Sequence, residues 1–276
     1  MKFTFLKNKY LKKLFVLFEK YGEELYVVGG AVRDSLMDNP ISDIDLATTM
    51  LPEKMMEMFE ENNLRHDGPG IRFGTVRSFF ANERFEITTL RQDKYEKIVK
   101  KKKKYISRYP KVTFVTDLKI DAYRRDFTIN AIYVNKNGDV FDPFNGMEDL
   151  KNGVVKYIGN PLDSVEQDPF RILRYFRICA ENFYKNFDEV ALAVSIANFD
   201  KVFRINKRKF ITEYNRLMAC RGRFIILNKW EEYGILNQIQ EHAAVCAEEV
   251  RIEDEKEKER ENARRKKLLQ QQEQQD

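Results

Sequence analysis

The sequence Gly29-Gly30-Ala31-Val32-Arg33-Asp34 is followed, nine residues later, by Asp43-Ile44-Asp45. The four residues before it, Leu25-Tyr26-Val27-Val28, are mostly apolar, which predicts a short buried strand. The glycines therefore lie at a strand-to-helix turn, where backbone N–H groups can approach a phosphate because no side chain intervenes. Arg33 adds a guanidinium, whose planar fork suits phosphate oxygens.

Asp43 and Asp45 belong to a segment, residues 41–46, in which apolar and polar residues alternate. This alternation predicts a strand with both carboxylates on one face. Glu86 lies between two apolar residues in another predicted strand. Carboxylates this close repel each other unless a cation lies between them, and oxygen ligands suit Mg²⁺. Three acids on one sheet face would hold two Mg²⁺ ions for in-line phosphoryl transfer, whereas an isolated D-x-D is also typical of a solvent-facing edge strand.

The charge of the chain is unevenly distributed. Its 276 residues carry a net charge of +5, but residues 241–276 are net acidic, so the rest is more basic than the total suggests. Basic residues concentrate in residues 91–111 and 201–223, and with 13 Tyr and 21 Phe they favour a polyanionic partner such as nucleic acid. Two histidines and three scattered cysteines argue against a zinc site or histidine-based catalysis.

The residue pattern predicts an α+β chain that becomes helical after about residue 160. Residues 1–18 are predicted to form an amphipathic helix without a signal-peptide cleavage site, and no apolar run is long enough to span a membrane, so we expect a cytoplasmic protein. The basic segment 91–111 is predicted to be a loop, and residues 248–276 either a lone charged helix or disordered. The predicted strands are residues 25–28, 41–46, 74–80, 85–90, 112–115, 131–134 and 140–141; the predicted helices are 31–37, 51–62, 168–182, 189–197, 209–218 and 224–233.

Three further blocks carry a family resemblance: Arg124-Arg125-Asp126-Phe127-Thr128-Ile129-Asn130-Ala131, Asp142-Pro143-Phe144-Asn145-Gly146, and Gln167-Asp168-Pro169-Phe170-Arg171-Ile172-Leu173-Arg174. Together with the first stretch, they resemble the signature of class II tRNA nucleotidyltransferases (CCA-adding enzymes) and bacterial poly(A) polymerases. The third block departs from the family pattern at Gln167, where the family has an acid.

The resemblance implies a nucleotidyltransferase head with a mixed β-sheet and helices over residues 1–150, then an all-helical neck and truncated body over 151–240, and a charged, Gln-rich tail over 241–276. It also implies site residues. Asp43, Asp45 and Glu86 are expected to be catalytic and to hold two Mg²⁺ ions. The expected nucleotide-binding residues are Gly29, Gly30, Arg33, Asp34, Arg124, Arg125, Asp126, Asn130, Asp168, Arg171 and Arg174.

Asp168 and Arg171, spaced i and i+3 in a predicted helix, would share one face and, by resemblance, select the incoming base. A carboxylate accepts from the exocyclic amine of C or A, and a guanidinium donates to the adjacent ring nitrogen or carbonyl. Two structural alternatives stay open: Asp168 caps the helix with Pro169 at its first position, or Ser164 and Gln167 form a capping box one turn earlier.

The activity implied is template-independent addition of CCA to tRNA 3′ ends from CTP and ATP, with release of pyrophosphate. The expected partners are the tRNA 3′ end and acceptor stem and nucleoside triphosphates, with no membrane; homo-oligomerisation stays open. In the family, a loop at the position of residues 91–111 separates complete or A addition from CC addition alone. The alternatives are a poly(A) polymerase, a partial CC- or A-adding enzyme, and a non-catalytic RNA-binding relative.

Overall fold

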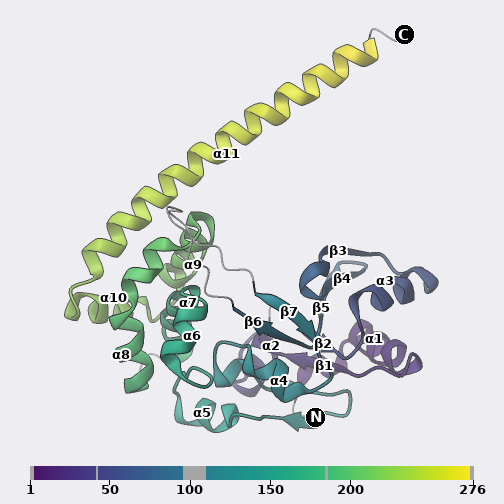
Figure 1. Cartoon of the computed structure of the whole chain (residues 1–276), viewed down its shortest axis with the longest axis horizontal. Coiled ribbons are helices and arrows are strands. Elements are labelled where there is room, and N and C mark those ends of the chain that lie inside the picture. Colours follow the sequence, from purple (N-terminus) through teal and green to yellow (C-terminus); the bar gives the residue numbers. More distant parts are fainter. Residues whose placement is uncertain (1–2, 42, 96–109, 184–185, 274–276) are drawn as a thin grey trace. The chain divides into compact units, whose positions relative to one another are not determined.

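The computed structural model describes residues 3–41, 43–95, 110–183 and 186–273 (Figure 1). These residues form two compact units. The first extends to Asp168 and also includes a short segment that ends at Val194; the second contains the other residues from Pro169 onward. The α+β class expected from the sequence is confirmed.

The first unit is built on a seven-stranded mixed sheet with the order β3-β4-β5-β2-β1-β8-β9. Its pairings are antiparallel except for β2 with β5, which are parallel. A separate hairpin pairs β6 with β7. The strands are β1 (Leu25–Val28), β2 (Asp45–Thr48), β3 (His66–Gly70), β4 (Thr75–Phe80), β5 (Glu83–Thr89), β6 (Arg91–Lys94), β7 (Lys111–Phe114), β8 (Tyr133–Val134) and β9 (Val140–Phe141).

Two of the sequence predictions are wrong at their boundaries. The strand predicted over residues 41–46 begins only at Asp45, because its partner β1 ends at Val28, opposite Asp45. Asp43 therefore precedes the strand and does not share a strand face with Asp45. The segment 91–111 is also not a loop throughout, since its two ends pair as β6 and β7. Its middle, residues 96–109, lies outside the described residues.

The two faces of the large sheet are covered by different helices. One face packs against α1 (Lys9–Lys20) and α3 (Pro52–Glu61), and its core includes Leu46, Phe85 and Ile87. The opposite face has a smaller core with Ala47 and Ala122 of α4 (Leu118–Tyr123). Side chains alternate along a strand, so Asp45 and Glu86 lie on the face opposite α1 and α3. The other helices of this unit are α2 (Gly30–Leu36), α5 (Gly146–Asn152) and α6 (Pro161–Gln167).

The second unit is helical. Its core centres on Trp230, whose ring contacts those of Phe176 and Phe199 edge-on, at centroid distances of 5.5 and 5.7 Å. All three rings are buried, and such edge-to-face pairs add to the stabilisation from burial. The helices are α7 (Phe170–Ile178), which continues as a π-helical turn (Cys179–Phe183), α9 (Lys207–Ala219), α10 (Arg223–Glu232) and α11 (Leu236–Glu273), while α8 (Glu189–Ala197) is divided between the units.

The helix predicted over residues 168–182 begins only at Phe170. Asp168 has extended backbone angles, φ −144° and ψ 97°, because a residue that precedes proline is disfavoured in the helical region. Asp168 and Arg171 therefore do not share a helix face. The capping box at Ser164 and Gln167 is also wrong, since Ser164 lies inside α6, whose N-terminus is capped by the Asn160 side chain.

The described part of α11 runs to Glu273, so the helical alternative for this charged segment is confirmed there. In the part of the chain that the structure describes, no helix combines the length and the apolar character needed to cross a membrane.

Candidate active site

The glycine turn lies beside a carboxylate and a guanidinium. β1 ends at Val28, Gly29 adopts φ +80° and ψ −137°, and α2 begins at Gly30. A Cβ at Gly29 would lie 3.8 Å from Asp45 Oδ2 and 3.9 Å from Arg125 Nη1. Only glycine adopts this backbone conformation without strain, so the turn brings the backbone close to both charged groups.

The register between β2 and β5 places two of the predicted metal ligands side by side. Asp45 is the partner of Glu86 in this parallel pair, and the two residues lie on the same face of the sheet. Glu86 also has cationic neighbours, because Arg77 is its partner in β4 and Arg84 Nη2 lies 3.5 Å from Glu86 Oε1. The face that carries Asp45 is thus lined by alternating charges.

The third predicted ligand is not brought into this pair by strand geometry. Asp43 is exposed and lies before β2, and among the described residues no group of three or more His, Cys, Asp or Glu side chains is arranged to hold a metal ion. The donor chemistry still fits Mg²⁺, because this ion usually takes one or two carboxylates and completes its shell with water and substrate phosphates. Asp45 and Glu86, with Asp43 nearby in sequence, are such a donor set.

The first and second sequence blocks are joined by hydrogen bonds at the start of α2. Arg33 is only 8% exposed, and its Nη1 donates to Asn130 Oδ1 at 3.0 Å while its Nε donates to Asp34 at 2.9 Å. Asn130 in turn donates to Asp126 Oδ1 at 3.1 Å. Four of the predicted nucleotide-binding residues, from segments almost 100 residues apart, therefore form one network.

The arginine pair of the second block is held by a buried carboxylate, Asp121. Its Oδ1 accepts from Arg124 Nε at 2.8 Å, and its Oδ2 accepts from Arg125 Nη2 at 3.2 Å. The Tyr133 hydroxyl donates to Asp121 Oδ2 at 2.7 Å and accepts from Arg125 Nε at 2.9 Å. The Arg91 backbone N–H donates to Asp121 as well, at 3.0 Å, which attaches the start of β6 to the same group.

The charges in this cluster stabilise one another. Burial alone would raise the pKa of Asp121, but Arg125 and Arg124 outweigh it, so the pKa falls to about 2. Burial also opposes the charge on Arg125, yet Tyr133 and Asp121 raise its pKa above the ordinary value for arginine. Burial raises the pKa of Tyr133, which stays protonated and can donate to Asp121. The arginines are therefore fixed as cations in defined orientations.

The sequence reasoning missed Asp121 and Tyr133. It predicted no helix between residues 116 and 130, whereas Leu118–Tyr123 form α4. Asp121 precedes Arg124 and Arg125 by three and four residues, a spacing that brings side chains together on a helical turn. That spacing was the available signal.

The block that begins at Asp142 has a structural explanation. Asp142 accepts from the backbone N–H groups of Gly146 and Met147 at 2.8 and 2.9 Å, which caps the first turn of α5. A Cβ on Gly146 would lie 2.3 Å from the carbonyl oxygen of Thr128. Glycine is required here because the backbone of α5 packs directly against the turn that carries Asn130.

The third block is divided by Pro169. Asp168 lies after α6 in extended backbone, and Arg171 lies in the first turn of α7 and is buried. Arg174, one turn further along α7, lines a pocket of the helical unit with residues of α9.

Known proteins with similar sequences are CCA-adding enzymes. The family model described as Poly A polymerase head domain matches residues 25–156. The human CCA tRNA nucleotidyltransferase 1, mitochondrial, is 43% identical over 176 residues, which cover 63% of this chain and 38% of that protein. The CCA-adding enzyme of Enterococcus faecalis is 34% identical over 226 residues, 81% of this chain and 52% of that enzyme. Residues 25–156 therefore match the poly(A) polymerase head domain, and the chain is similar to CCA-adding enzymes.

The family fold is also found in solved structures. The crystal structure of the Bacillus stearothermophilus CCA-adding enzyme in complex with CTP superposes with a TM-score of 0.71 at 27% identity, covering 84% of this chain and 56% of that one. This chain spans about half the length, or less, of the curated family members to which it is compared. The similarity therefore concerns the head and the helices that follow it.

Proposed function

We propose that this protein adds CMP, CMP and AMP to tRNA 3′ ends, using CTP and ATP and no nucleic-acid template. The observation that carries the proposal is the parallel register of Asp45 and Glu86, with Asp45 beside the glycine turn and Arg125. Carboxylates, a turn that exposes backbone and a fixed guanidinium are the groups that a triphosphate and its counter-ions require. The CCA-adding enzymes among its relatives support tRNA as the acceptor.

In the reaction, the 3′-hydroxyl oxygen of the RNA bonds to the α-phosphorus of the nucleotide, the α–β phosphoanhydride bond breaks, and pyrophosphate leaves. Arg33, Arg124 and Arg125 would bind the triphosphate or ribose, and Asp126 and Asn130 the sugar. Because hydrogen bonds hold these arginines before substrate arrives, little ordering entropy is lost on binding.

Asp43, Asp45 and Glu86 would hold two Mg²⁺ ions. When bound, such ions lower the pKa of an attacking hydroxyl and neutralise charge on a leaving pyrophosphate. The resemblance to the family assigns the choice of base to Asp168 and Arg171. Their acceptor and donor groups match the pairing edges of C and A, whereas U and G present the reverse order of donors and acceptors.

The deciding experiment offers the protein tRNAs that end before, within and after CCA, with each nucleoside triphosphate alone and in mixtures, and sequences the 3′ ends. Addition that stops at CCA is the expected result. Long A-tails would indicate a poly(A) polymerase, addition that ends at CC or needs a CC end would indicate a partial enzyme, and no addition would indicate a non-catalytic RNA-binding protein.

The same assay tests the carboxylates. Asp45→Asn should lower CMP incorporation by at least about a thousandfold, because it removes a metal-ligand charge at the reacting phosphate. Glu57→Gln, an exposed carboxylate on α3, is the matched control and should keep wild-type activity. Incorporation by Asp45→Asn at the control rate would remove Asp45 from the catalytic centre.

A further inference from the structure

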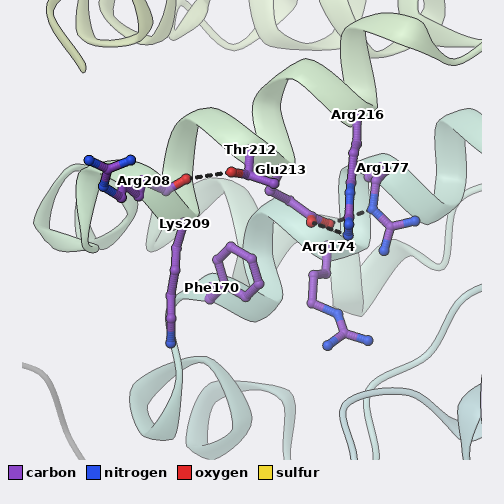
Figure 2. Close-up of a pocket in the computed structure, with 8 residues that line it drawn as sticks. All are labelled: Phe170, Arg174, Arg177, Arg208, Lys209, Thr212, Glu213 and Arg216. Carbon is purple, nitrogen blue, oxygen red and sulfur yellow. Dashed lines mark hydrogen bonds and ion pairs between the residues drawn. The ribbon is translucent and has the colours of Figure 1, made fainter. Parts of the chain in front are cut away.

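A cationic pocket lies within the helical unit, between α7 and α9 (Figure 2). Its volume is about 350 Å³, within the range of pockets that hold a small ligand or a single nucleotide unit. Five of its eight lining residues are basic and only one is acidic: Phe170, Arg174, Arg177, Arg208, Lys209, Thr212, Glu213 and Arg216.

The single carboxylate does not neutralise this excess of positive charge. Glu213 is 3% exposed and is bound by Arg177, which also pairs with Glu181 at 2.5 Å. Arg216 Nη1 is 3.9 Å from Glu213, and the Arg216 side chain is 67% exposed. Glu213 thus serves to fix Arg177 between the helices, while the exposed Arg216 side chain remains available to a ligand.

Lys209 is available in the same way. Within the described ranges no carboxylate lies within ion-pair distance of its ammonium group, whereas the neighbouring Arg208 is paired with Asp254 at 2.5 Å. Figure 2 shows the Phe170 ring between the side chains of Lys209 and Arg174. An aromatic face flanked by two cations is the arrangement on which single-stranded nucleic acids stack a base while their phosphates are neutralised.

We propose that this pocket binds one phosphodiester unit of the RNA strand, with the phosphate held by Lys209, Arg174 and Arg216 and the base or ribose against Phe170. Guanidinium groups bind phosphate oxygens through paired N–H donors, and the pocket has too few carboxylates for a metal ion. The inference rests on the proposed function for the identity of the strand. It assigns Arg174 to RNA, not to the incoming nucleotide.

Phosphate could also come from the nucleoside triphosphate, so the test measures both ligands. The variant is Lys209→Gln with Arg216→Gln in the full chain. The first measurement is the affinity for a tRNA that lacks its 3′ CCA, by fluorescence anisotropy at several salt concentrations. The slope of the logarithm of affinity against the logarithm of salt concentration should be shallower by about 1 to 2. This is because binding releases fewer counterions when phosphate contacts are lost.

The matched control is Lys12→Gln with Lys20→Gln, two exposed residues of α1 that change the net charge equally. It should keep the wild-type salt dependence. A second variant, Phe170→Leu, should weaken RNA binding about five- to 100-fold through loss of stacking, with the salt dependence unchanged.

CTP affinity, measured by calorimetry, separates the two sources of phosphate. It should be unchanged in Lys209→Gln with Arg216→Gln. A loss of CTP affinity with wild-type RNA binding would overturn the proposal, and so would an equal loss of salt dependence in the α1 control. Absence of CMP incorporation by the wild-type protein would refute the proposed function instead, and the binding measurements would still decide the pocket.

Discussion

Asp121 holds both arginines of the second block through one buried carboxylate, so its removal affects two of the proposed nucleotide-binding groups at once. Asp121→Asn keeps the shape of the side chain but removes the charge that fixes Arg124 and Arg125. We expect a higher KM for CTP and a lower stability. Because the pKa of Asp121 is lowered to about 2 from 3.8, its ionisation stabilises the folded protein by about 2 kcal/mol at neutral pH.

This stabilisation has a defined pH dependence. It is complete above about pH 4, where the carboxyl is ionised in both states, and it is lost as the pH falls toward 2. Urea unfolding of wild type and Asp121→Asn between pH 7 and pH 3 should give a stability difference that narrows below pH 4. Asp117→Asn, which keeps a capping side chain on the same helix, is the control. A difference that is constant with pH would contradict the role of the Asp121 charge.

The base-selecting assignment is tested at the same scale. Asp168→Ala with Arg171→Ala should relax the choice among CTP, ATP, UTP and GTP more than it weakens triphosphate binding, because the arginines of the head are untouched. Competition among the four nucleotides, followed by 3′-end sequencing, measures this. Asp163→Ala, exposed on α6, serves as the reference. If nucleotide selectivity is unchanged in the double variant, Asp168 has only a structural role before Pro169.

Most of the candidate site is visible in the sequence because its residues lie in contiguous blocks. Gly29, Asp45 and Arg125 can be selected in this way, and the structure brings all three to one point. Asp121 lies outside these blocks; its spacing to Arg124 and Arg125 indicates an ion pair, but its burial beside Tyr133, twelve residues further along, could not be predicted from that spacing. Burial that involves a distant partner is a tertiary property.

At the scale of elements, the sequence pattern predicts the bounds of a strand well where the neighbouring strand is as long as the predicted segment. β1 has the predicted bounds, whereas the alternating segment 41–46 gives only the last two of its residues to β2. A strand extends only as far as its neighbours supply hydrogen bonds, and β1 stops at the glycine turn. Helix α7 is likewise shorter than its apolar pattern, because Pro169 restricts the residue before it.

The contact between α5 and the turn that carries Asn130 supports a prediction about Gly146. Gly146→Ala should destabilise the protein by about 3 kcal/mol, because its Cβ would collide with the Thr128 carbonyl and neither backbone can move without breaking the Asp142 cap. Thermal unfolding measures the effect.

Gly68→Ala is the matched control for this position, since its Cβ would meet neighbours at ordinary distances of 3.4 Å or more. It should shift the unfolding midpoint much less. Equal midpoints for the two variants would show that α5 adapts to the added methyl group.

At the scale of the whole molecule, the boundaries predicted at residues 150 and 240 stay predictions. The structure does divide the described residues into two units, and in the second one α11 is anchored to α9 near its beginning. Lys207 pairs with Glu249, Arg208 pairs with Asp254, and Cys246 is buried. Residues 255–262, by contrast, are exposed.

A chain that ends at Lys258 should therefore keep its unfolding midpoint within about 2 °C of the full chain, because it retains Cys246 and both ion pairs, and residues 259–262, which it loses, are exposed. A chain that ends at Val245 loses Cys246 and both ion pairs and should unfold at a clearly lower temperature. Circular dichroism during heating compares the three proteins. A much lower unfolding midpoint for the chain that ends at Lys258 would show that the exposed part of α11 makes stabilising contacts with another molecule.

During translation, Asp45 and Glu86 leave the ribosome well before Arg125 and before β8, which pairs with β1 on its other side. At roughly 5–20 residues per second, the interval between residues 45 and 134 is about 5–20 s. Throughout it, the nascent chain presents its carboxylates without the guanidinium that faces them across Gly29. If the proposed function holds, the groups that would bind the triphosphate are therefore brought together only after about half of the 276 residues have been made.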